Sequence, residues 1–177
     1  MGRPPPRWGW HELQPAWAAR LVADAALPAG ATVLDIGAGL GALTAPLVAS
    51  GARVVAVEAH DRRAHALRER FGKGAVVVQT DAADLRLPRH PYHVVANPPF
   101  GLTTVLLRRF LQRGSRLQSA RLVVQQQAAV RWASPGAPAY ARWSVDFAVT
   151  LGPVVPAGAF RPPPPVRCRV LVIQRRP

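Results

Sequence analysis

Apolar residues along the first part of the chain follow two spacings, one typical of helices and one typical of buried strands. Over residues 12–26 they recur at every fourth position from Leu13 to Ala25, which predicts an amphipathic helix. A short, mostly β-branched run at 32–36 predicts a buried strand, and a glycine-rich turn and a helix over 42–50 follow it. The pattern therefore begins with a strand-then-helix unit.

The strand-then-helix unit recurs further along the chain. The expected strands cover residues 53–57, 76–80, 94–96 and 122–124, and the expected helices cover 62–71, 103–111 and a stretch that ends at Trp132. Because buried parallel strands are apolar on both faces and are joined by helices, this alternation indicates a mostly parallel sheet with helices on both sides.

The pattern changes after residue 133. A loop is expected at 134–138, a strand at 143–151, a second loop at 153–165 and a last strand at 166–173, where arginines alternate with apolar residues. These two strands predict an antiparallel hairpin at one edge of the sheet. The predicted fold class is therefore α/β, Rossmann-like, with a mostly parallel seven-stranded sheet and an antiparallel edge hairpin.

Composition excludes several classes of protein. Hydrophobic residues make up 49% of the 177 residues, which is too many for a disordered chain, and no apolar run reaches the roughly 20 residues that cross a bilayer. One cysteine excludes an internal disulfide, and the five histidines do not show zinc-site spacing, so we expect no metal. We expect a cytoplasmic protein with a basic, tryptophan-bearing segment at 1–11 and one domain at 12–177.

Charge points to a polyanionic partner. Lysine and arginine number 23 against 9 acidic residues, so the formal net charge is +14, and all but one of the basic residues are arginine. A positive surface on a folded domain favours RNA or DNA as the partner.

A glycine-rich turn follows the first predicted strand. Asp35 lies near the end of that strand, and Gly37, Gly39 and Gly41 come next, ahead of a helix. Small residues at this place let the backbone approach a ligand, which predicts a nucleoside site. A dinucleotide site begins in the same way, and a simple tight turn is the alternative without a ligand.

Acidic residues end the next two predicted strands. Glu58 comes 17 residues after Gly41, where a carboxylate accepts hydrogen bonds from both ribose hydroxyls. Asp81 and Ala82 follow the third strand and are candidates for the amino edge of an adenine, with Asp84 as a competing carboxylate. The alternative for Glu58 is an ordinary surface position.

The segment Asn97-Pro98-Pro99-Phe100 follows the fourth predicted strand. Two prolines make a stiff, extended turn, which leaves the Asn97 side chain and the Pro98 carbonyl available as acceptors. Two acceptors match the two hydrogens of an exocyclic amine, and the Phe100 ring stacks on a planar base. A rigid loop with a buried phenylalanine is the alternative.

Together these motifs resemble the class I S-adenosylmethionine-dependent methyltransferases that act on amino groups. More narrowly, the chain resembles the ribosomal RNA adenine-N6 methyltransferases, namely the Erm macrolide-resistance enzymes and their KsgA-type relatives. The likeness continues through a late stretch with Val155, Pro156, Phe160, Pro162, Pro164 and Val166. The resemblance implies methyl transfer from S-adenosylmethionine, leaving S-adenosylhomocysteine, to an adenine of 23S ribosomal RNA, with antibiotic resistance as the result.

The resemblance also assigns further roles. His11 and Ala59 join the cofactor-binding residues, as does Asn97, and Phe160 is expected on the loop opposite Phe100 as a second stacking ring. The usual glutamine-containing motif is replaced by Trp10-His11-Glu12, and the family's helical C-terminal domain is expected to be absent. Trp132 and Trp143 are expected in the core, while Trp8 and Trp10 are candidates for base contacts.

Several arginines are expected to contact phosphate. The main candidates are Arg108, Arg109, Arg142 and Arg161, with Arg113 and Arg116 in addition. We expect a monomer that acts on ribosomal RNA. Two other functions stay open at this point: an amino methyltransferase for small-subunit RNA, DNA adenine or protein, and a non-catalytic RNA-binding module on the same fold.

Overall fold

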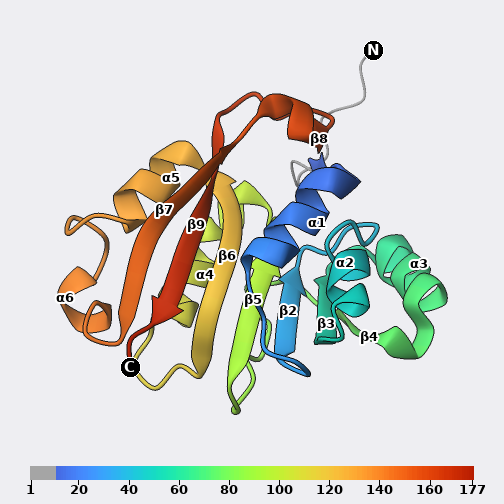
Figure 1. The fold of residues 1–177 in the computed structure, drawn as a ribbon, viewed down its shortest axis with the longest axis horizontal. Helices are drawn as coiled ribbons and strands as arrows, with labels where there is room; N and C mark the ends of the chain where they lie inside the picture. The colour runs from blue at the N-terminus through green and yellow to red at the C-terminus, as the bar shows by residue number, and fades with distance from the viewer. Residues whose placement is uncertain (1–10) are drawn as a thin grey trace.

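A seven-stranded sheet organises the computed structural model, which describes residues 11–177 (Figure 1). Its strands are β2 (Thr32–Ile36), β3 (Arg53–Glu58), β4 (Ala75–Gln79), β5 (Tyr92–Ala96), β6 (Leu117–Gln125), β7 (Phe147–Val155) and β9 (Cys168–Arg175). They lie in the order β4-β3-β2-β5-β6-β9-β7. The first five pair in parallel, and β9 pairs antiparallel with both β6 and β7. The predicted parallel sheet with an antiparallel edge hairpin is confirmed.

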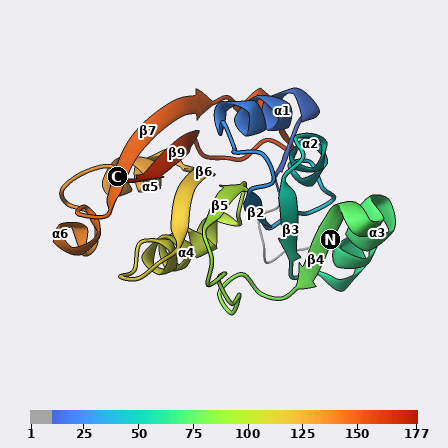
Figure 2. The ribbon, with the colours of Figure 1, turned by 60° about the horizontal axis from the view of Figure 1, so that its bottom comes forward.

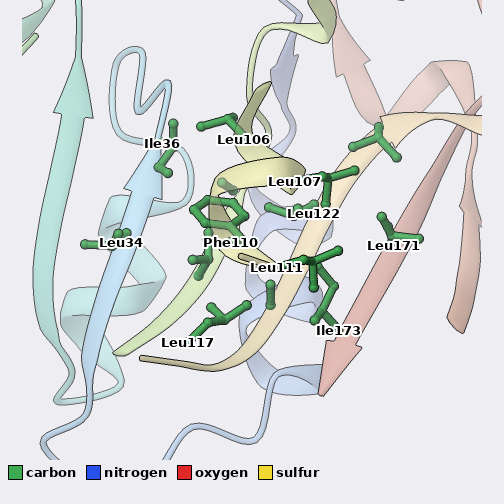
Figure 3. Packing of buried hydrophobic residues seen from close by; sticks show 14 of the residues in the cluster. Leu34, Ile36, Leu106, Leu107, Phe110, Leu111, Leu117, Leu122, Leu171 and Ile173 are labelled. Carbon is green, nitrogen blue, oxygen red and sulfur yellow. The ribbon is translucent and has the colours of Figure 1, made fainter. Parts of the chain in front are cut away.

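Helices cover both faces of the sheet. They are α1 (Pro15–Asp24), α2 (Thr44–Ala49), α3 (Asp61–Phe71), α4 (Thr103–Phe110), α5 (Gln126–Trp132) and α6 (Tyr140–Trp143). One apolar cluster joins α1 and α2 to alternate strand residues such as Val33, and another joins α4 to the residues between them, such as Leu34. Figure 2 shows α1 and α2 on one side of the sheet and α4 on the other, and Figure 3 shows Phe110 of α4 among the strand side chains. Burial on both faces explains the continuous apolar strands of the sequence.

The first helix starts later than the hydrophobic spacing predicts. Residues 12 and 13 instead form β1 (Glu12–Leu13), which pairs antiparallel with β8 (Phe160–Arg161), and α1 begins at Pro15. The residue before a proline is driven to extended backbone, and Gln14 has φ −67° and ψ 149°. Proline therefore sets the boundary, and the chain ahead of it is free to pair with a distant segment.

The strand predicted at 143–151 begins later, at Phe147. Trp143 lies at the end of α6 instead, where its ring nitrogen donates to the Pro138 carbonyl at 2.9 Å. Trp143 and Trp132 are both buried in the core, as expected. The loop predicted at 153–165 starts only after Val155 and contains β8. Trp8 and Trp10 lie outside the described residues, as does the rest of segment 1–10.

Within residues 11–177 we find no helix with the length and apolar character that a membrane crossing requires.

Candidate active site

A cavity of about 390 Å³ lies at the carboxyl ends of β2, β3, β4 and β5. The strands β2, β3 and β4 follow one another toward one edge of the sheet, and the chain then returns past them to place β5 on the other side of β2. Open α/β sheets bind ligands at such a switch point. Ten of the residues singled out from the sequence line this cavity: His11, Asp35, Gly37, Glu58, Ala59, Asp81, Ala82, Asn97, Pro98 and Phe100. The fold thus gathers residues that are up to 89 positions apart in the chain, from His11 to Phe100.

Asp35 contributes a buried carboxyl group at the end of β2. Its side chain is 1% exposed, and the Thr44 hydroxyl of α2 donates a hydrogen bond of 2.7 Å to its Oδ2. The pKa of Asp35 is raised to about 7, mainly by burial; the nearby Glu58 carboxylate adds to this rise, and hydrogen bonding to Thr44 opposes it. A buried acid of this kind gains from a cationic ligand, because the ligand's charge favours its ionised form.

Glu58 contributes a second carboxylate at the end of β3. It is 4% exposed, so it is not the ordinary surface residue that the sequence left possible. Its Oε1 accepts the His60 amide at 2.8 Å and the Arg63 guanidinium at 2.9 and 3.1 Å. Its Oε2 accepts the Gly39 amide at 2.9 Å and no other donor within residues 11–177. Oε2 therefore has more remaining capacity than Oε1 to accept a hydroxyl.

The three glycines of the turn have different roles. Gly37 has φ +74°, and a Cβ added to it would meet Pro99 Cδ at 2.9 Å, so this glycine makes room for the Asn97-Pro98-Pro99-Phe100 loop. A Cβ on Gly41 would lie 2.5 Å from the Phe71 ring of α3. Gly39 and Gly41 are not among the cavity-lining residues, and Gly39 acts on the site through its amide, which orients Glu58.

Of the two aspartates that follow β4, Asp81 and Asp84, only one lines the cavity. The strand ends at Gln79, and Asp81 follows in a loop in which its Oδ1 accepts the Ala83 amide at 2.8 Å. Asp81 lines the cavity together with Ala82, whereas Asp84 is exposed and points elsewhere. The geometry favours Asp81 over Asp84 as the ligand-facing carboxylate.

Asn97 is held in one orientation by the segment ahead of α1. Its side-chain Nδ2 donates to the His11 carbonyl at 2.6 Å, which leaves the side-chain oxygen as its free acceptor. The His11 ring stacks on Phe100, with centroids 6.0 Å apart and planes 19° apart, and its Nδ1 lies 2.9 Å from the Pro162 carbonyl. The β1–β8 pair therefore holds together the segment that orients Asn97.

Two expected RNA contacts are corrected by the geometry. Phe160 is 2% exposed and packs in the core cluster that contains Leu13, so it does not offer a second stacking ring to the cavity. The Arg109 guanidinium donates to the Ala82, Ala83 and Leu85 carbonyls, so it holds the loop after β4 and is not available for phosphate.

The remaining expected arginines lie at different ends of the sheet. Arg142 belongs to α6, next to the start of β7 and opposite the cavity, so its predicted place near the active face is wrong. Arg113 and Arg116 lie in and after the turn before β6, at the same far edge. Arg161 is exposed in β8, paired with Glu12 beside the cavity, and Arg108 is exposed near the end of α4.

Sequence reasoning missed two residues that organise the carboxylates. Arg63 lines the cavity and pairs with Glu58, and its place in the first turn of the helix after β3 is the only signal that pointed to it. Thr44 bonds Asp35 from the start of α2, and no local pattern marks it.

Comparisons with known proteins show the family of the chain. The family model described as ribosomal RNA adenine dimethylase matches residues 12–177. An rRNA adenine N-6-methyltransferase of Corynebacterium diphtheriae is 40% identical over 81% of this chain and 57% of its own length. The mycinamicin-resistance protein MyrB of Micromonospora griseorubida is 39% identical over 81% of this chain and 47% of its own. A ribosomal RNA small subunit methyltransferase A of Anaeromyxobacter dehalogenans is 35% identical over 96% and 67%.

Solved structures resemble the fold closely. The 23S rRNA methyltransferase ErmE superposes with a TM-score of 0.79 at 26% identity, covering 93% of this chain and 69% of that one. A dimethyladenosine transferase from Plasmodium falciparum gives the same TM-score at 22% identity, covering 94% and 64%. The chain spans about half the length of the first two curated relatives.

Proposed function

Because this chain belongs to the ribosomal RNA adenine dimethylase family, we propose that it transfers a methyl group from S-adenosylmethionine to the N6 amine of an adenine in ribosomal RNA. One observation carries the proposal. The Asn97-Pro98-Pro99-Phe100 loop opens into the same cavity as the buried carboxylates Asp35 and Glu58. A site for a flat amine and a site for a cationic nucleoside are thus joined.

The described residues fit the cofactor by charge and shape. The Asp35 carboxyl group is 1% exposed and has no ion pair within residues 11–177, so its ionised form is costly without a positive charge, and the cofactor carries one on its sulfonium and another on its amine. We assign Glu58 Oε2 to a ribose hydroxyl, Asp81 and Ala82 to the adenine, and Asp35 with the Gly37–Gly41 turn to the rest of the molecule. His11 and Ala59 complete the lining. When bound, the cofactor supplies an electrophilic methyl group.

The chain's own residues act on the target amine. The Asn97 side-chain oxygen and the Pro98 carbonyl accept its two hydrogens, which favours a pyramidal nitrogen whose lone pair points into the cavity. Phe100 stacks on the base and replaces part of the stacking that the base loses when it leaves the RNA. After the methyl group has been transferred, the alkylated nitrogen is acidic. Its proton therefore leaves to water or to a weak acceptor.

We propose 23S ribosomal RNA as the target, with macrolide resistance as the consequence. Support comes from two relatives, since MyrB is named for resistance and ErmE is named a 23S rRNA methyltransferase. Small-subunit RNA is the second candidate, because a relative named for the small subunit aligns over 96% of this chain.

A panel of substrates tests the proposal. Purified protein is given labelled S-adenosylmethionine with protein-free 23S RNA, 16S RNA, adenine-containing DNA and bulk protein, and the label in each is counted. We expect label in 23S RNA as N6-methyladenine, and loss of roughly a hundredfold or more of that rate in Asn97→Ala with cofactor affinity nearly unchanged. Label confined to 16S RNA selects the second candidate. Binding of RNA without label in any substrate contradicts the enzyme assignment.

A further inference from the structure

A second groove lies at the same edge of the sheet as the candidate cavity. It has a volume of about 540 Å³ and lies between α5 and the turn that leads into β9. Glutamines 125–127 contribute amide groups, and Val130 and Val166 contribute apolar surface that is 48% and 39% exposed. Arg131 and Arg167 complete the lining.

The sheet register places this groove beside the target-amine loop. Gln125 ends β6 and pairs with Cys168 at the start of β9, and β6 is the direct neighbour of β5, after which Asn97 follows. Neighbouring strands are about 4.8 Å apart, and Ala96 at the end of β5 pairs with Leu122, so Gln125 lies one strand to the side of β5 and three residues beyond its end. In Figure 1, α5 and the start of β9 adjoin in the upper part of the molecule, and β8 lies farther to the right, beside α1.

The chemistry of the lining suits a nucleotide. Arg131 and Arg167 are exposed, and within residues 11–177 neither guanidinium makes a hydrogen bond or ion pair, so both are available for phosphate. Glutamine amides donate and accept, as base edges do, and exposed valines offer apolar contact to a base or ribose. Cationic, amide and apolar groups side by side are typical of sites for unstacked nucleotides.

We propose that this groove binds a single-stranded nucleotide that flanks the target adenine. The inference rests on the proposed function, because it takes the RNA to enter at Asn97. Arg131 and Arg167 hold the phosphates, and the glutamines contact the base. A neighbour held this way keeps the RNA open around the target, so the groove contributes to which adenines reach the cavity.

Paired charge reversals at opposite edges of the sheet test the proposal. The groove variant is Arg131→Glu with Arg167→Glu. The matched control is Arg113→Glu with Arg142→Glu, which changes the net charge equally at exposed positions on the far edge. Fluorescence anisotropy of a labelled ten-nucleotide single-stranded RNA with one central adenine gives the affinity. We expect at least a tenfold loss in the groove variant, a salt slope smaller by about 1.4, and less than a twofold loss in the control.

Equal losses in both variants mean that only net charge matters, and they overturn the groove. An unchanged affinity in the groove variant overturns it as well. Calorimetry with S-adenosylmethionine, expected to give the same affinity in both variants, shows that each is folded. Because RNA binding is measured without turnover, groove-dependent binding with no methyl transfer contradicts only the proposed function. Methyl transfer with unchanged RNA affinity in the groove variant contradicts only the groove.

The contact to the base has its own measurement. RNAs that differ only in the two nucleotides beside the central adenine are compared in the wild type and in Gln127→Leu, which keeps the size of an exposed side chain and removes its amide. We expect a preference of at least threefold in the wild type that falls toward one in the variant. A preference that survives in Gln127→Leu removes this glutamine from the base contact.

Discussion

Asp35 and Glu58 lie side by side in one cavity, yet their surroundings differ in what they demand of a ligand. Glu58 is held by two backbone amides and Arg63, so its negative charge is compensated within the protein. The Asp35 carboxyl group is hydrogen-bonded by Thr44 but has no ion pair within residues 11–177, and its pKa is raised to about 7 by burial and by Glu58. The ligand's positive charge therefore matters most at Asp35.

This difference predicts a pH dependence of both stability and binding. The folded-state pKa of Asp35 lies above its unfolded value of 3.8, so between about pH 4 and 7 the folded chain binds more protons than the unfolded chain. The stability that this carboxyl group contributes is thus lost as the pH rises through about 7. Binding of a cation favours the ionised form, so cofactor affinity is expected to fall as the pH drops below about 7.

Asp35→Asn separates these effects. We expect a higher melting temperature at pH 8, a flatter dependence of melting temperature on pH between 5 and 8, and weaker cofactor binding at pH 8. Thermal unfolding and calorimetry at several pH values measure all three. Asp84→Asn, an exposed control outside the cavity, is expected to change none of them. An Asp35→Asn protein with the wild-type pH profile contradicts the assignment of the profile to this group.

The same control serves for the adenine contact. Asp81→Asn keeps the size of a cavity-lining side chain and removes its charge, so cofactor affinity is expected to fall by about 1–3 kcal/mol, the range for a hydrogen bond to a charged group. Calorimetry on the two asparagine variants decides the matter, and equal affinities exclude Asp81 from the site.

Glu58→Ala is expected to weaken binding by a similar amount, and it also leaves the Gly39 and His60 amides without their acceptor.

At the level of elements, α4 supports the side of the cavity that we assign to the adenine of the cofactor. Arg109 in its last turn donates to three carbonyls of the loop after β4, the loop that carries Asp81 and Ala82. The helix thus fixes a loop that has no regular backbone pairing of its own. An arginine expected from the sequence to contact RNA serves the cofactor pocket instead.

Adjacent arginines on α4 allow a matched test. Arg109→Ala is expected to lower the free energy of unfolding by about 2 kcal/mol and to weaken cofactor binding, because three carbonyls lose a charged donor. Arg108→Ala, at the exposed neighbour, is expected to stay within about 0.5 kcal/mol of the wild type. Chemical denaturation and calorimetry give both quantities. Two variants of equal stability contradict the role given to Arg109.

For the whole molecule, the net charge is +14, and arginines lie at both edges of the sheet. Arg161, Arg131 and Arg167 lie at the edge with the cavity, while Arg113, Arg116 and Arg142 lie at the far edge. A strand of RNA at the cavity edge contacts the first group, and the second acts only through the long-range field. Affinity for RNA is therefore expected to depend on a few phosphate contacts and not on the full charge.

The salt dependence of RNA binding measures the number of these contacts. Three phosphates neutralised on a single strand, one for each arginine at the cavity edge, give a slope of log affinity against log salt of about −2. Titrations of one single-stranded RNA between about 50 and 300 mM salt are expected to give a slope near this value. A slope near zero contradicts phosphate contacts as the main source of affinity, and a slope of about −4 or steeper means that the far edge binds RNA too.

The pattern of apolar residues along the chain was enough to predict the sheet and the edge of the sheet at which the site lies. Runs of β-branched and apolar residues mark β2 to β6, because parallel strands buried on both faces have no polar side. Residues at the ends of such strands meet at one edge, and Asp35, Glu58, Asp81 and Asn97 were each singled out at or after the end of a predicted strand; the resemblance to a known family joined them into one site. The local sequence is enough to place these strands and their ends, because the preference of a segment for a buried strand depends on a few neighbouring residues.

Only the tertiary structure decided how these groups are partnered. Four features each join segments that are far apart in the chain. They are the pairing of β1 with β8, the hydrogen bond of Asn97 to the His11 carbonyl, the burial of Phe160 and the hydrogen bonds of Arg109 to the loop after β4. No local pattern distinguishes an arginine that binds phosphate from one that holds a loop, because the side chain is the same and only its neighbours differ. The sequence determined which chemistry reaches the sheet edge, and packing decided which of those groups remain free to meet a ligand.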